Sequence, residues 1–565
     1  MSDEARRRLR EAFLRRNRLV REQLLQRGPV DQPRNDDEAR FGREVNYFAS
    51  YSKGLPHDDS GEVEPDAFET MRSALETPGG GDFDAIPEPG PRPLTNPEAA
   101  TSFNTVGLDP NDVYAPAAPA FDSAETAAEM VELYWMALLR DVPFDEYETN
   151  GLAADAASEL SGLTGFTGPT ARSDLFRGTV EGATEGPYVS QFLLKNFERG
   201  VIERDQRFRP LEPTDYVIDF SDWLAVQNGE IPDGGINRTT PDQPSLSDAG
   251  VRETGRRYPV TGRDLATYVG ENVSQQPYLN AALILQNSEP GDDSPGNLAL
   301  TNLAASGPGS VPTTPGLPVD PNVPDGFVDY VRGGYQSILG GILQTHAHAA
   351  WYHKWRVHRR LRPEEFGGRV YHVVTGSRID GQSAADRYPI HGQLLNSTAL
   401  SSTQNDSELK TSLLPQAYPD GSPTHPSFPG GHAVTAGSNA TILKAYFDEG
   451  AVIENPVKPD PSDPTTLVPT GGPTLTVGGE INKLAANISY ARSLAGIHYR
   501  TDTTSGLRIG ERVATAVLRE RLRQRSADAY GSAGEFSFTT FDGDDVTVSV
   551  DGVSPADAFD PPLFG

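Results

Sequence analysis

The sequence predicts a mainly α-helical protein, and three observations support that fold class. Several long segments repeat apolar residues every three or four positions, as helices with one buried face do. Linkers rich in proline, glycine, threonine and aspartate separate these segments. Only the C-terminal tail, FSFTTFDGDDVTVSVDG, alternates apolar and polar residues as strands do, and it predicts a small β hairpin. The segments with helical periodicity are residues 122–142, 187–200, 262–287, 326–361, 431–448, 478–495 and 502–525.

The first 30 residues predict a basic amphipathic helix. Nine arginines and four acidic residues give this segment a charge of +5, although the whole chain carries −30. The segment lacks the apolar centre of a secretory signal. Basic amphipathic helices can bind membrane surfaces. Because the remaining chain is so acidic, we expect this helix to dock on the protein itself or on a sister subunit.

The order of the remaining segments favours one large domain without tandem repeats. Its first helix has Ser123 as a candidate N-cap. Two stretches rich in proline and glycine, residues 290–325 and 455–477, predict long loops. The predicted divisions are the basic helix at residues 1–30, a polar irregular arm at 31–110, the helical domain at 111–530 and the tail at 531–565.

The composition is strongly acidic. The chain has 79 aspartates and glutamates against 49 lysines and arginines, and its isoelectric point is near 4.7. Such a surface repels nucleic acids and anionic membranes, so neither is an expected partner. Only seven of the basic residues are lysines, a bias that resembles the proteins of salt-loving archaea. The alternative is a solvated acidic surface in an ordinary organism.

Two absences from the sequence exclude further classes of protein. Because the chain has no cysteine, it cannot form disulfides, iron–sulfur clusters or a cysteine nucleophile. No run of about 18 apolar residues occurs, so no membrane-spanning helix is predicted. Without a recognisable signal or span, the expected location is the cytoplasm.

Three short segments carry the residues with recognisable chemistry: Lys354–Pro363 (KWRVHRRLRP), Pro426–His432 (PSFPGGH) and Arg492–His498 (RSLAGIH). Arginine suits an oxyanion because its planar guanidinium stays protonated and binds two oxygens at once. Backbone N–H groups at a helix start add donors, and two adjacent glycines allow an anion to approach them closely. Together the segments predict a pocket for a tetrahedral oxyanion.

Local geometry predicts how these segments meet. The proline after Arg362 disfavours helical geometry, so Lys354 should lie in the last turns of a helix and Arg362 just beyond its end. Arg492 and His498 are six residues apart, which at about 100° per residue does not place them on one helical face. The chain must bend between them, and Gly496 is the expected position.

Most of the histidines lie in the second half of the chain, and nine of the ten follow position 340. Four crowd one predicted helix: His346, His348, His353 and His358. A zinc site is one interpretation, but the sequence has no HExxH motif, no cysteine and no i, i+4 pair among these four. We interpret the group as packed side chains. For His425, packing and catalysis both stay open.

The three segments resemble the signature shared by the vanadium-dependent haloperoxidases and the type 2 phosphatidic acid phosphatases. That signature is a lysine and an Arg-Pro, then Pro-Ser-Gly-His, then an arginine six residues before a histidine. The likeness is stronger to the haloperoxidases of marine algae, because eight residues separate Lys354 from Arg362 and an additional histidine, His425, precedes the second segment's histidine by seven. Trp351 also fits, and the resemblance extends over most of residues 321–525.

The resemblance implies a fold of two four-helix bundles with the anion site at the end of one bundle, in a homodimer or a higher homo-oligomer. It implies an enzyme that oxidises halide, with bromide favoured, using hydrogen peroxide. The product would be hypohalous acid, which halogenates nearby organic compounds.

The resemblance also implies roles for individual residues, with vanadate as the cofactor. His498 would be the one protein ligand of vanadium, and His432 the acid–base catalyst. Lys354 would also activate the oxidant, His425 would favour bromide, and Trp351 would line the pocket. The residues implied to hold the vanadate oxygens are Lys354, Arg362, Gly430, Gly431 and Arg492.

One position departs from the family pattern, because Gly430 stands where the pattern has serine. The missing hydroxyl donor would cost about 1.5 to 3 kcal/mol if nothing replaced it.

Two other functions stay open from the sequence. A soluble acid phosphatase would use the same pocket, with His498 as the nucleophile and His432 protonating the leaving group. A non-catalytic oxyanion-binding protein is the other alternative, motivated by Gly430.

Overall fold

The computed structural model describes residues 3–26, 30–199, 202–232, 255–271, 273–287, 332–524 and 534–563. These residues form a mainly helical protein in which strands are confined to small antiparallel sheets. The helices are α1 (Asp3–Gln26), α2 (Asp37–Arg40), α3 (Pro65–Glu76), α4 (Ala124–Leu138), α5 (Gly151–Gly162), α6 (Gln191–Leu194), α7 (Phe220–Gln227), α8 (Gly262–Glu271), α9 (Gln276–Asn287), α10 (Arg332–Trp351), α11 (Pro363–Thr375), α12 (Ala384–Arg387), α13 (Gly392–Leu395), α14 (Thr398–Asn405), α15 (Gly431–Tyr446), α16 (Val477–Leu494) and α17 (Arg500–Gln524). The strands are β1 (Phe197–Arg199), β2 (Ile202–Arg204), β3 (Arg378–Ile379), β4 (Gln382–Ser383), β5 (Val457–Asp460), β6 (Asp463–Pro469), β7 (Phe536–Thr539), β8 (Asp545–Val548) and β9 (Val553–Ser554). The predicted fold class and the predicted C-terminal hairpin are confirmed.

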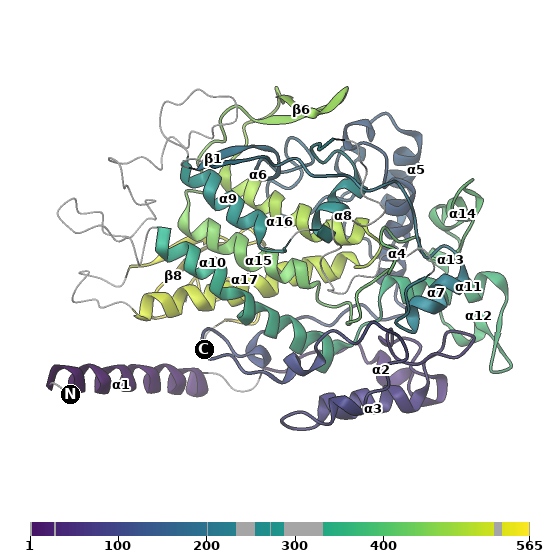
Figure 1. Cartoon of the computed structure of the whole chain (residues 1–565), viewed down its shortest axis with the longest axis horizontal. Helices are drawn as coiled ribbons and strands as arrows, with labels where there is room; N and C mark the ends of the chain where they lie inside the picture. The colour runs from purple at the N-terminus through teal and green to yellow at the C-terminus, as the bar shows by residue number, and fades with distance from the viewer. Residues whose placement is uncertain are drawn as a thin grey trace.

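Four long helices, α10, α15, α16 and α17, lie side by side in the centre of the protein (Figure 1). Glycines bring the backbones of α15 and α17 into direct contact. A Cβ on Gly437 would lie 2.0 Å from the carbonyl oxygen of Leu507, and one on Gly510 would lie 2.2 Å from that of Val434. No side chain fits between the two helices at these points, so backbone contact fixes their spacing.

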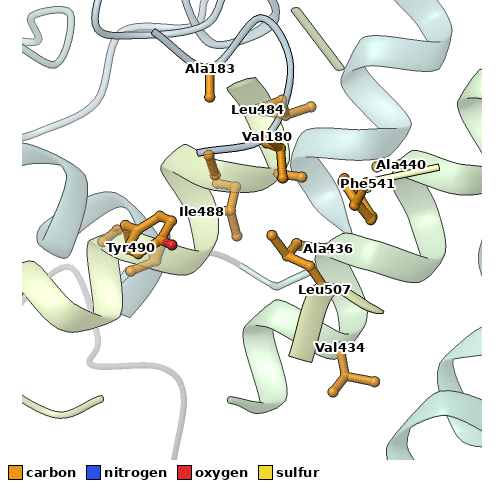
Figure 2. Close-up of a cluster of buried hydrophobic side chains, with 14 of the residues drawn as sticks. Val180, Ala183, Val434, Ala436, Ala440, Leu484, Ile488, Tyr490, Leu507 and Phe541 are labelled. Atoms are coloured by element: carbon orange, nitrogen blue, oxygen red, sulfur yellow. The ribbon is translucent and has the colours of Figure 1, made fainter. Parts of the chain in front are cut away.

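Apolar side chains fill the remaining space between these helices. In Figure 2, Ile488 of α16 points toward Ala436 of α15 and Leu507 of α17, and Val180 covers the group from the loop that precedes α6. Ile488, Ala436 and Leu507 are each no more than 1% exposed. Burial of this kind contributes about 1.5 to 3 kcal/mol for each large aliphatic side chain. The bundle is therefore close-packed, and it holds the residues at the ends of its helices in fixed positions.

Helix α4 packs beside the start of α17 and supplies two buried carboxylates. Glu129 accepts a hydrogen bond from Arg360 at 2.8 Å, and Glu132 accepts one from the Nε of Arg500 at 2.9 Å. Removing one partner of such a buried pair costs about 3 to 5 kcal/mol, because the other charge is left without a counterion. These pairs hold the loop after α10 and the first residue of α17 against α4.

The segment predicted as an irregular arm contains helix α3 and a second apolar cluster. Leu55, Phe68 and Met71 are fully buried there beside Trp355. The sequence-based prediction missed α3 because its 12 residues begin at a proline and end in a polar, glycine-rich loop. The arm is thus a packed layer against the π-helical turn Tyr352–His358.

The predicted helices agree with the structure over most of the bundle. Helix α4 begins after Ser123, whose Oγ accepts a hydrogen bond from the N–H of Thr126 at 3.1 Å, as expected for an N-cap. The segment 262–287 is divided into α8 and α9, and the segment 326–361 becomes α10 followed by the π-helical turn. Helices α15, α16 and α17 lie within two residues of their predicted bounds.

Two predicted elements are wrong. Among the described residues 187–199, only the short α6 is helical, and β1 follows it. A short apolar run such as FLLKNF does not distinguish a buried helix from a strand. Residues 455–477 were expected to form a loop but contain the β5–β6 hairpin, in which Val457 pairs with Pro469. The predicted loop at 290–325 lies outside the described residues.

Among the described helices, none has the length and apolar character needed to cross a bilayer.

Buried charged groups fasten the C-terminal sheet to α15 and α17. Glu511 accepts a hydrogen bond from the N–H of Phe541 at 2.9 Å, and Glu449 accepts one from the N–H of Thr539 at 2.8 Å. Lys444 lies between them and donates to the Thr539 carbonyl. Burial raises the pKa of Glu511 and of Glu449 to about 7, although Lys444 acts in the opposite direction.

Replacing Glu511 by glutamine should stabilise the protein more at pH 8 than at pH 5. The pKa of Glu511 is raised to about 7 in the folded state from a reference value of 4.5, so its contribution to stability is greatest below the reference value and falls as the pH rises through 7. Burying the carboxylate above pH 7 costs on the order of 1 to 3 kcal/mol. Glutamine keeps the acceptor for Phe541.

The measurement is the thermal midpoint of both proteins at the two pH values, with Glu408→Gln as an exposed control. A midpoint difference that does not grow with pH would contradict this account of Glu511.

Candidate functional site

The three segments singled out in the sequence meet at the ends of α10, α15 and α17. Lys354 lies in the π-helical turn after α10, and Arg362 is the N-cap residue of α11. Gly430 is the N-cap residue of α15. Helix α16 ends at Leu494, and the chain turns through Gly496, whose φ of +87° favours glycine, before α17 begins. The predicted bend therefore lies at the predicted residue.

Arg362 is the residue that joins the segments. It is fully buried, and its Nη1 donates to the Nε2 of His498 at 2.9 Å. Its Nη2 donates to the Nδ1 of His425 at 2.9 Å, and its Nε donates to the His425 carbonyl at 2.8 Å. Burial lowers the pKa of Arg362 to about 10, so the guanidinium stays protonated at neutral pH. A single fixed cation thus contacts two of the predicted histidines.

His498 has a defined tautomer. Its Nδ1 lies 2.8 Å from a carboxylate oxygen of Asp502 and donates the proton to it, because an ionised carboxylate can only accept. Burial and the Arg362 guanidinium lower the pKa of His498 well below its usual range, so the ring is neutral. The Nε2 therefore carries a lone pair, and this is the atom that faces Arg362. A neutral imidazole held this way by a carboxylate is the usual form of a metal-ligating histidine.

Asp502 is a functional residue that the sequence-based analysis missed. Its carboxylate accepts from His498, from the N–H of Tyr499 at 3.1 Å, from the hydroxyl of Ser427 and from Arg360 at 3.0 Å. Burial would raise the pKa of Asp502, but Arg360 and the hydrogen bond from His498 hold it well below its usual range. A signal was present in IHYRTD, where Asp502 follows His498 by four residues, one helical turn.

Lys354 is buried and points at the start of α15. Its Nζ donates to the carbonyl oxygens of Pro426 and Ser427 at 2.6 and 2.9 Å. Desolvation and the neighbouring Arg362 lower the pKa of Lys354 well below its usual range, with Asp502 opposing them. The Lys354 side chain thus lies beside other cations, and among the described residues no carboxylate is in direct contact with its Nζ.

Arg492 lies over the ring of Tyr418, with its guanidinium carbon 5.6 Å from the ring centroid. The Nε of Arg492 is buried and has no hydrogen-bond partner among the described residues. A buried guanidinium donor left unpaired is costly. It indicates that an acceptor from outside the chain completes this site.

His432, the second residue of α15, is half-buried. Desolvation and the charge of Arg492 lower its pKa well below its usual range, and Lys354 and Arg362 add to that effect. A hydrogen bond to the backbone of Val269 in α8 acts in the opposite direction. His432 is therefore a neutral base whose pKa is lowered by all three cations, Arg492, Lys354 and Arg362.

Trp351 and His425 form one wall beside these groups. Their ring centroids are 5.1 Å apart, and the indole N–H of Trp351 donates to the Thr95 carbonyl at 3.0 Å. A Cβ on Gly431 would lie 3.6 Å from Trp351 and 4.0 Å from the Cε of Lys354. The start of α15 thus faces this wall.

Gly430 is packed against the first turn of α17. Its N–H donates to the Asp502 carbonyl at 2.9 Å, and a Cβ at this position would lie 3.2 Å from the same oxygen. That contact is tight without being impossible. The hydroxyl of Ser427, three residues earlier, is directed to Asp502 and does not replace the missing serine.

The donor set fits an oxyanion such as vanadate. Lys354, Arg362 and Arg492 bring three positive charges together. Two carboxylates lie nearby: Asp502 is also paired with Arg360, and Glu365 accepts from the backbone N–H groups of Arg362 and Ser52. A bound polyanion would neutralise the excess positive charge and accept the unpaired Arg492 hydrogen bond. The Nε2 lone pair of His498 supplies one metal-ligating atom. Within the described residues no group of three or more histidines and carboxylates could hold a metal ion by itself.

The crowded histidines of α10 and the π-helical turn are packed side chains, as we interpreted them. His346 contacts the hydroxyls of Thr435 and Ser438 at 3.1 and 2.8 Å. His353 donates to the Val113 carbonyl at 2.7 Å.

Comparisons with known proteins agree with this geometry. The family model described as the VCPO second helical-bundle domain matches residues 343–526. A vanadium-dependent bromoperoxidase of Ascophyllum nodosum is 32% identical over 97% of this chain and 94% of its own length. One of Corallina pilulifera is 30% identical over 93% of this chain and 94% of its own length.

A solved structure shares the fold over nearly the whole chain. It is the homohexameric second vanadate-dependent bromoperoxidase of Ascophyllum nodosum, which matches with a TM-score of 0.80 and 27% identity over 96% of this chain and 90% of that one. With two relatives at 32% and 30% identity over almost its full length, the chain belongs to the vanadium-dependent bromoperoxidase family.

Proposed function

We propose that this protein is a vanadate-dependent haloperoxidase that oxidises bromide with hydrogen peroxide to hypobromous acid. The observation that carries the proposal is the lone pair of His498 Nε2, held by Asp502 and lying 2.9 Å from a cationic guanidinium. Bound vanadate would supply a Lewis-acidic centre that activates peroxide toward halide. The bromoperoxidase names of the relatives support bromide as the halide.

The contacts support a role for each residue of the site. His498 would ligate vanadium through Nε2, and Lys354, Arg362 and Arg492 would neutralise the oxygens, together with the N–H of Gly431 at the start of α15. The N–H of Gly430 already donates to the Asp502 carbonyl and is not available to vanadate. His432, as a neutral base, would accept and return protons when peroxide enters. His425 and Trp351 would form the wall that receives the halide.

One assay tests the proposed function against a phosphatase that uses the same cations. Metal-free protein is incubated with orthovanadate, and bromination of a dye with peroxide and bromide is measured beside hydrolysis of a phosphomonoester. We expect halogenation that depends on vanadate and little hydrolysis. Brisk hydrolysis without halogenation would favour the phosphatase, and neither activity would favour an oxyanion-binding protein.

Replacing His432 by alanine should slow halogenation while leaving vanadate bound. General acid–base catalysis contributes about 10²- to 10⁴-fold, so kcat should fall by that range. Loss of one hydrogen bond should weaken vanadate binding by no more than about tenfold. Equilibrium dialysis and steady-state kinetics measure the two effects separately. A variant with full turnover would remove His432 from its proposed role.

Introducing the family's serine with Gly430→Ser should tighten vanadate binding. A hydroxyl donor to a charged group contributes about 1.5 to 3 kcal/mol, and the Cβ contact at 3.2 Å from the Asp502 carbonyl offsets part of it. We expect a net gain of about three- to tenfold in affinity. Gly430→Ala is the matched control, because it adds the same Cβ without the donor. Equal affinities for the two variants would contradict the role of the hydroxyl.

Five broader statements are also proposals. The chain assembles as a homo-oligomer, which the homohexameric relative supports. Its acidic, lysine-poor composition supports a halophilic, archaeal source, and its signature supports membership of the superfamily that includes the type 2 phosphatidic acid phosphatases. The helical unit at residues 111–530 is the catalytic domain, and the family match at 343–526 lies inside it. We place its activity in the cytoplasm.

A further inference from the structure

Helix α4 presents two buried glutamates to the neighbouring segments, and they differ in their connection to the candidate site. Glu129 and Glu132 are 4% and 1% exposed and lie three residues apart, so they are neighbours on one face of the helix. Glu129 pairs with Arg360, and Glu132 pairs with Arg500. The two pairs have the same chemistry, and what distinguishes them is the next contact of each arginine.

Arg360 connects Glu129 to Asp502. Its Nη2 donates to a carboxylate oxygen of Glu129 at 2.8 Å, and its Nη1 donates to Oδ1 of Asp502 at 3.0 Å. The guanidinium carbon also lies 3.8 Å from the ring centroid of Tyr499, a cation–π contact that fixes the plane of the group. Two carboxylates therefore hold the two ends of one planar cation.

The two carboxylate oxygens of Asp502 have different partners. Oδ1 accepts from Arg360, whereas Oδ2 accepts from the Nδ1 of His498 at 2.8 Å and from the N–H of Tyr499 at 3.1 Å. The hydroxyl of Ser427 also donates to Oδ2. The orientation of the imidazole thus depends on Oδ2, the oxygen that the guanidinium does not use.

Glu129 occupies the second terminal nitrogen of Arg360. A guanidinium that faces a single carboxylate tends to bind both of its oxygens through two parallel hydrogen bonds. If Nη2 lost its acceptor on α4, Arg360 could turn and take both oxygens of Asp502. His498 would then share Oδ2 with a cation, and its own hydrogen bond to Oδ2 would lengthen.

Glu129 also fixes the first turn of α17. Its other carboxylate oxygen accepts a hydrogen bond from the N–H of Thr501, one of the groups at a helix start that have no acceptor inside the helix. The hydroxyl of Thr501 accepts from Nη1 of Arg360 at 2.8 Å. Because Thr501 directly precedes Asp502, one glutamate holds both the backbone beside this carboxylate and the cation that binds it.

The second pair ties α4 to α17 without this connection. Arg500 donates through its Nε to the two carboxylate oxygens of Glu132 at 3.1 and 2.9 Å. Within the part of the chain that the structure describes, Arg500 makes no hydrogen bond to Asp502. Glu132 is therefore a matched comparison, because it has the same charge and the same kind of partner but does not reach the group that orients His498.

We propose that Glu129 is a positioning residue for the vanadium ligand, His498. It keeps Arg360 on one oxygen of Asp502, so the other oxygen stays with the Nδ1 proton of the imidazole. The proposal rests on the function proposed above, which assigns the ligand. A buried negative charge repels an oxyanion, so Glu129 favours vanadate binding only through the geometry that it imposes.

The first test compares Glu129→Gln with Glu132→Gln by vanadate dissociation constants from equilibrium dialysis and by thermal midpoints. Each variant removes one negative charge from the same face of α4 and breaks one ion pair. Charge alone would tighten oxyanion binding in both variants, by no more than about threefold. We expect that result for Glu132→Gln, and a loss of about tenfold in affinity for Glu129→Gln. Equal changes in the two variants would overturn the proposal.

Arg360→Lys and its control Arg500→Lys repeat the comparison without a change of charge. Lysine has one nitrogen and cannot reproduce the two-nitrogen fork that joins Glu129 to Asp502. Arg360→Lys should weaken vanadate binding by about tenfold, whereas Arg500→Lys should bind vanadate as wild type does. This pair decides the question if a glutamine variant fails to fold, and equal affinities for the two lysine variants would contradict the proposal.

The Nδ1 proton of His498 gives a second measurement that needs no vanadate. An imidazole proton that is hydrogen-bonded to a carboxylate has a proton resonance far downfield, and its absence from His498→Ala identifies it. In metal-free protein, this resonance should move upfield in Glu129→Gln and stay in place in Glu132→Gln. An unmoved resonance in Glu129→Gln would overturn the positioning role. A resonance that moves in a protein unable to bind vanadate would support the positioning role and reject the proposed function.

Discussion

Replacing His498 by alanine is expected to abolish retention of vanadium and with it halogenation. The Nε2 of His498 is the metal-ligating atom of the proposed site, and no other described group of histidines or carboxylates could hold a metal ion by itself. Changes to residues that only support a ligand cost about 10- to 100-fold in metal affinity, so removal of the sole ligand should cost at least about 100-fold. Bromination should fall to that of free vanadate.

Vanadium bound per chain after gel filtration is the direct measurement, and dye bromination follows it. His391→Ala removes an exposed histidine from the start of α13 and should leave both values unchanged. Because the buried His498 contacts Asp502, the thermal midpoint of the variant must be recorded as well. A folded His498→Ala protein that keeps its vanadium would refute the assigned ligand.

Replacing Asp502 by asparagine is expected to have the second largest effect. Asparagine can turn its amide N–H toward the Nδ1 of His498, and the imidazole proton would then move to Nε2. An Nε2 that carries a proton cannot ligate a metal. Loss of the carboxylate also leaves Arg360 with Glu129 as its remaining carboxylate contact. We expect vanadate affinity to fall by about 10- to 100-fold and turnover by at least as much.

Asp502 positions the catalytic groups and would not touch the substrate, so the readout must separate affinity from folding. Vanadate dissociation constants from equilibrium dialysis, compared with thermal midpoints, do so. Ser427→Ala is the matched control: it removes one neutral donor to the same carboxylate and should have a smaller effect, within about tenfold. If Asp502→Asn binds vanadate as wild type does, the tautomer argument fails.

The helical core was accessible from the sequence because its signals are local. Ser123 caps α4, the glycine pair begins α15, and Gly496 separates α16 from α17. Gly496 has a positive φ that few other residues adopt, and Ser123 caps its helix through its hydroxyl, so both signals belong to particular residue types. The α3 layer and the β5–β6 hairpin were not accessible, because their positions depend on contacts with distant segments. Phe68 of α3 stacks on Tyr47 in the cluster that contains Trp355, and Val457 of β5 exchanges hydrogen bonds with Gln191.

The candidate site divides in the same way. The cations, the histidines and the two glycines stand at spacings that the sequence displays, and the structure places Arg362 in contact with His498 and His425. The carboxylates that support these cations show no recognisable spacing in the sequence. Glu129 reaches Arg360 across 231 positions of the chain, and only the fold brings them together. Asp502 was the exception, because it follows His498 by one helical turn.

The glycine contacts between α15 and α17 have a consequence for how the pocket can change. The start of α15 carries the Gly431 N–H, and the first turn of α17 carries Asp502. The contact between the two helices therefore sets the distance between this amide donor and the carboxylate that orients His498. Rotamer changes elsewhere cannot alter that interval. Discrimination between oxyanions of different size is then a property of main-chain geometry, and altered selectivity requires shifting a whole helix, starting with Gly437 or Gly510.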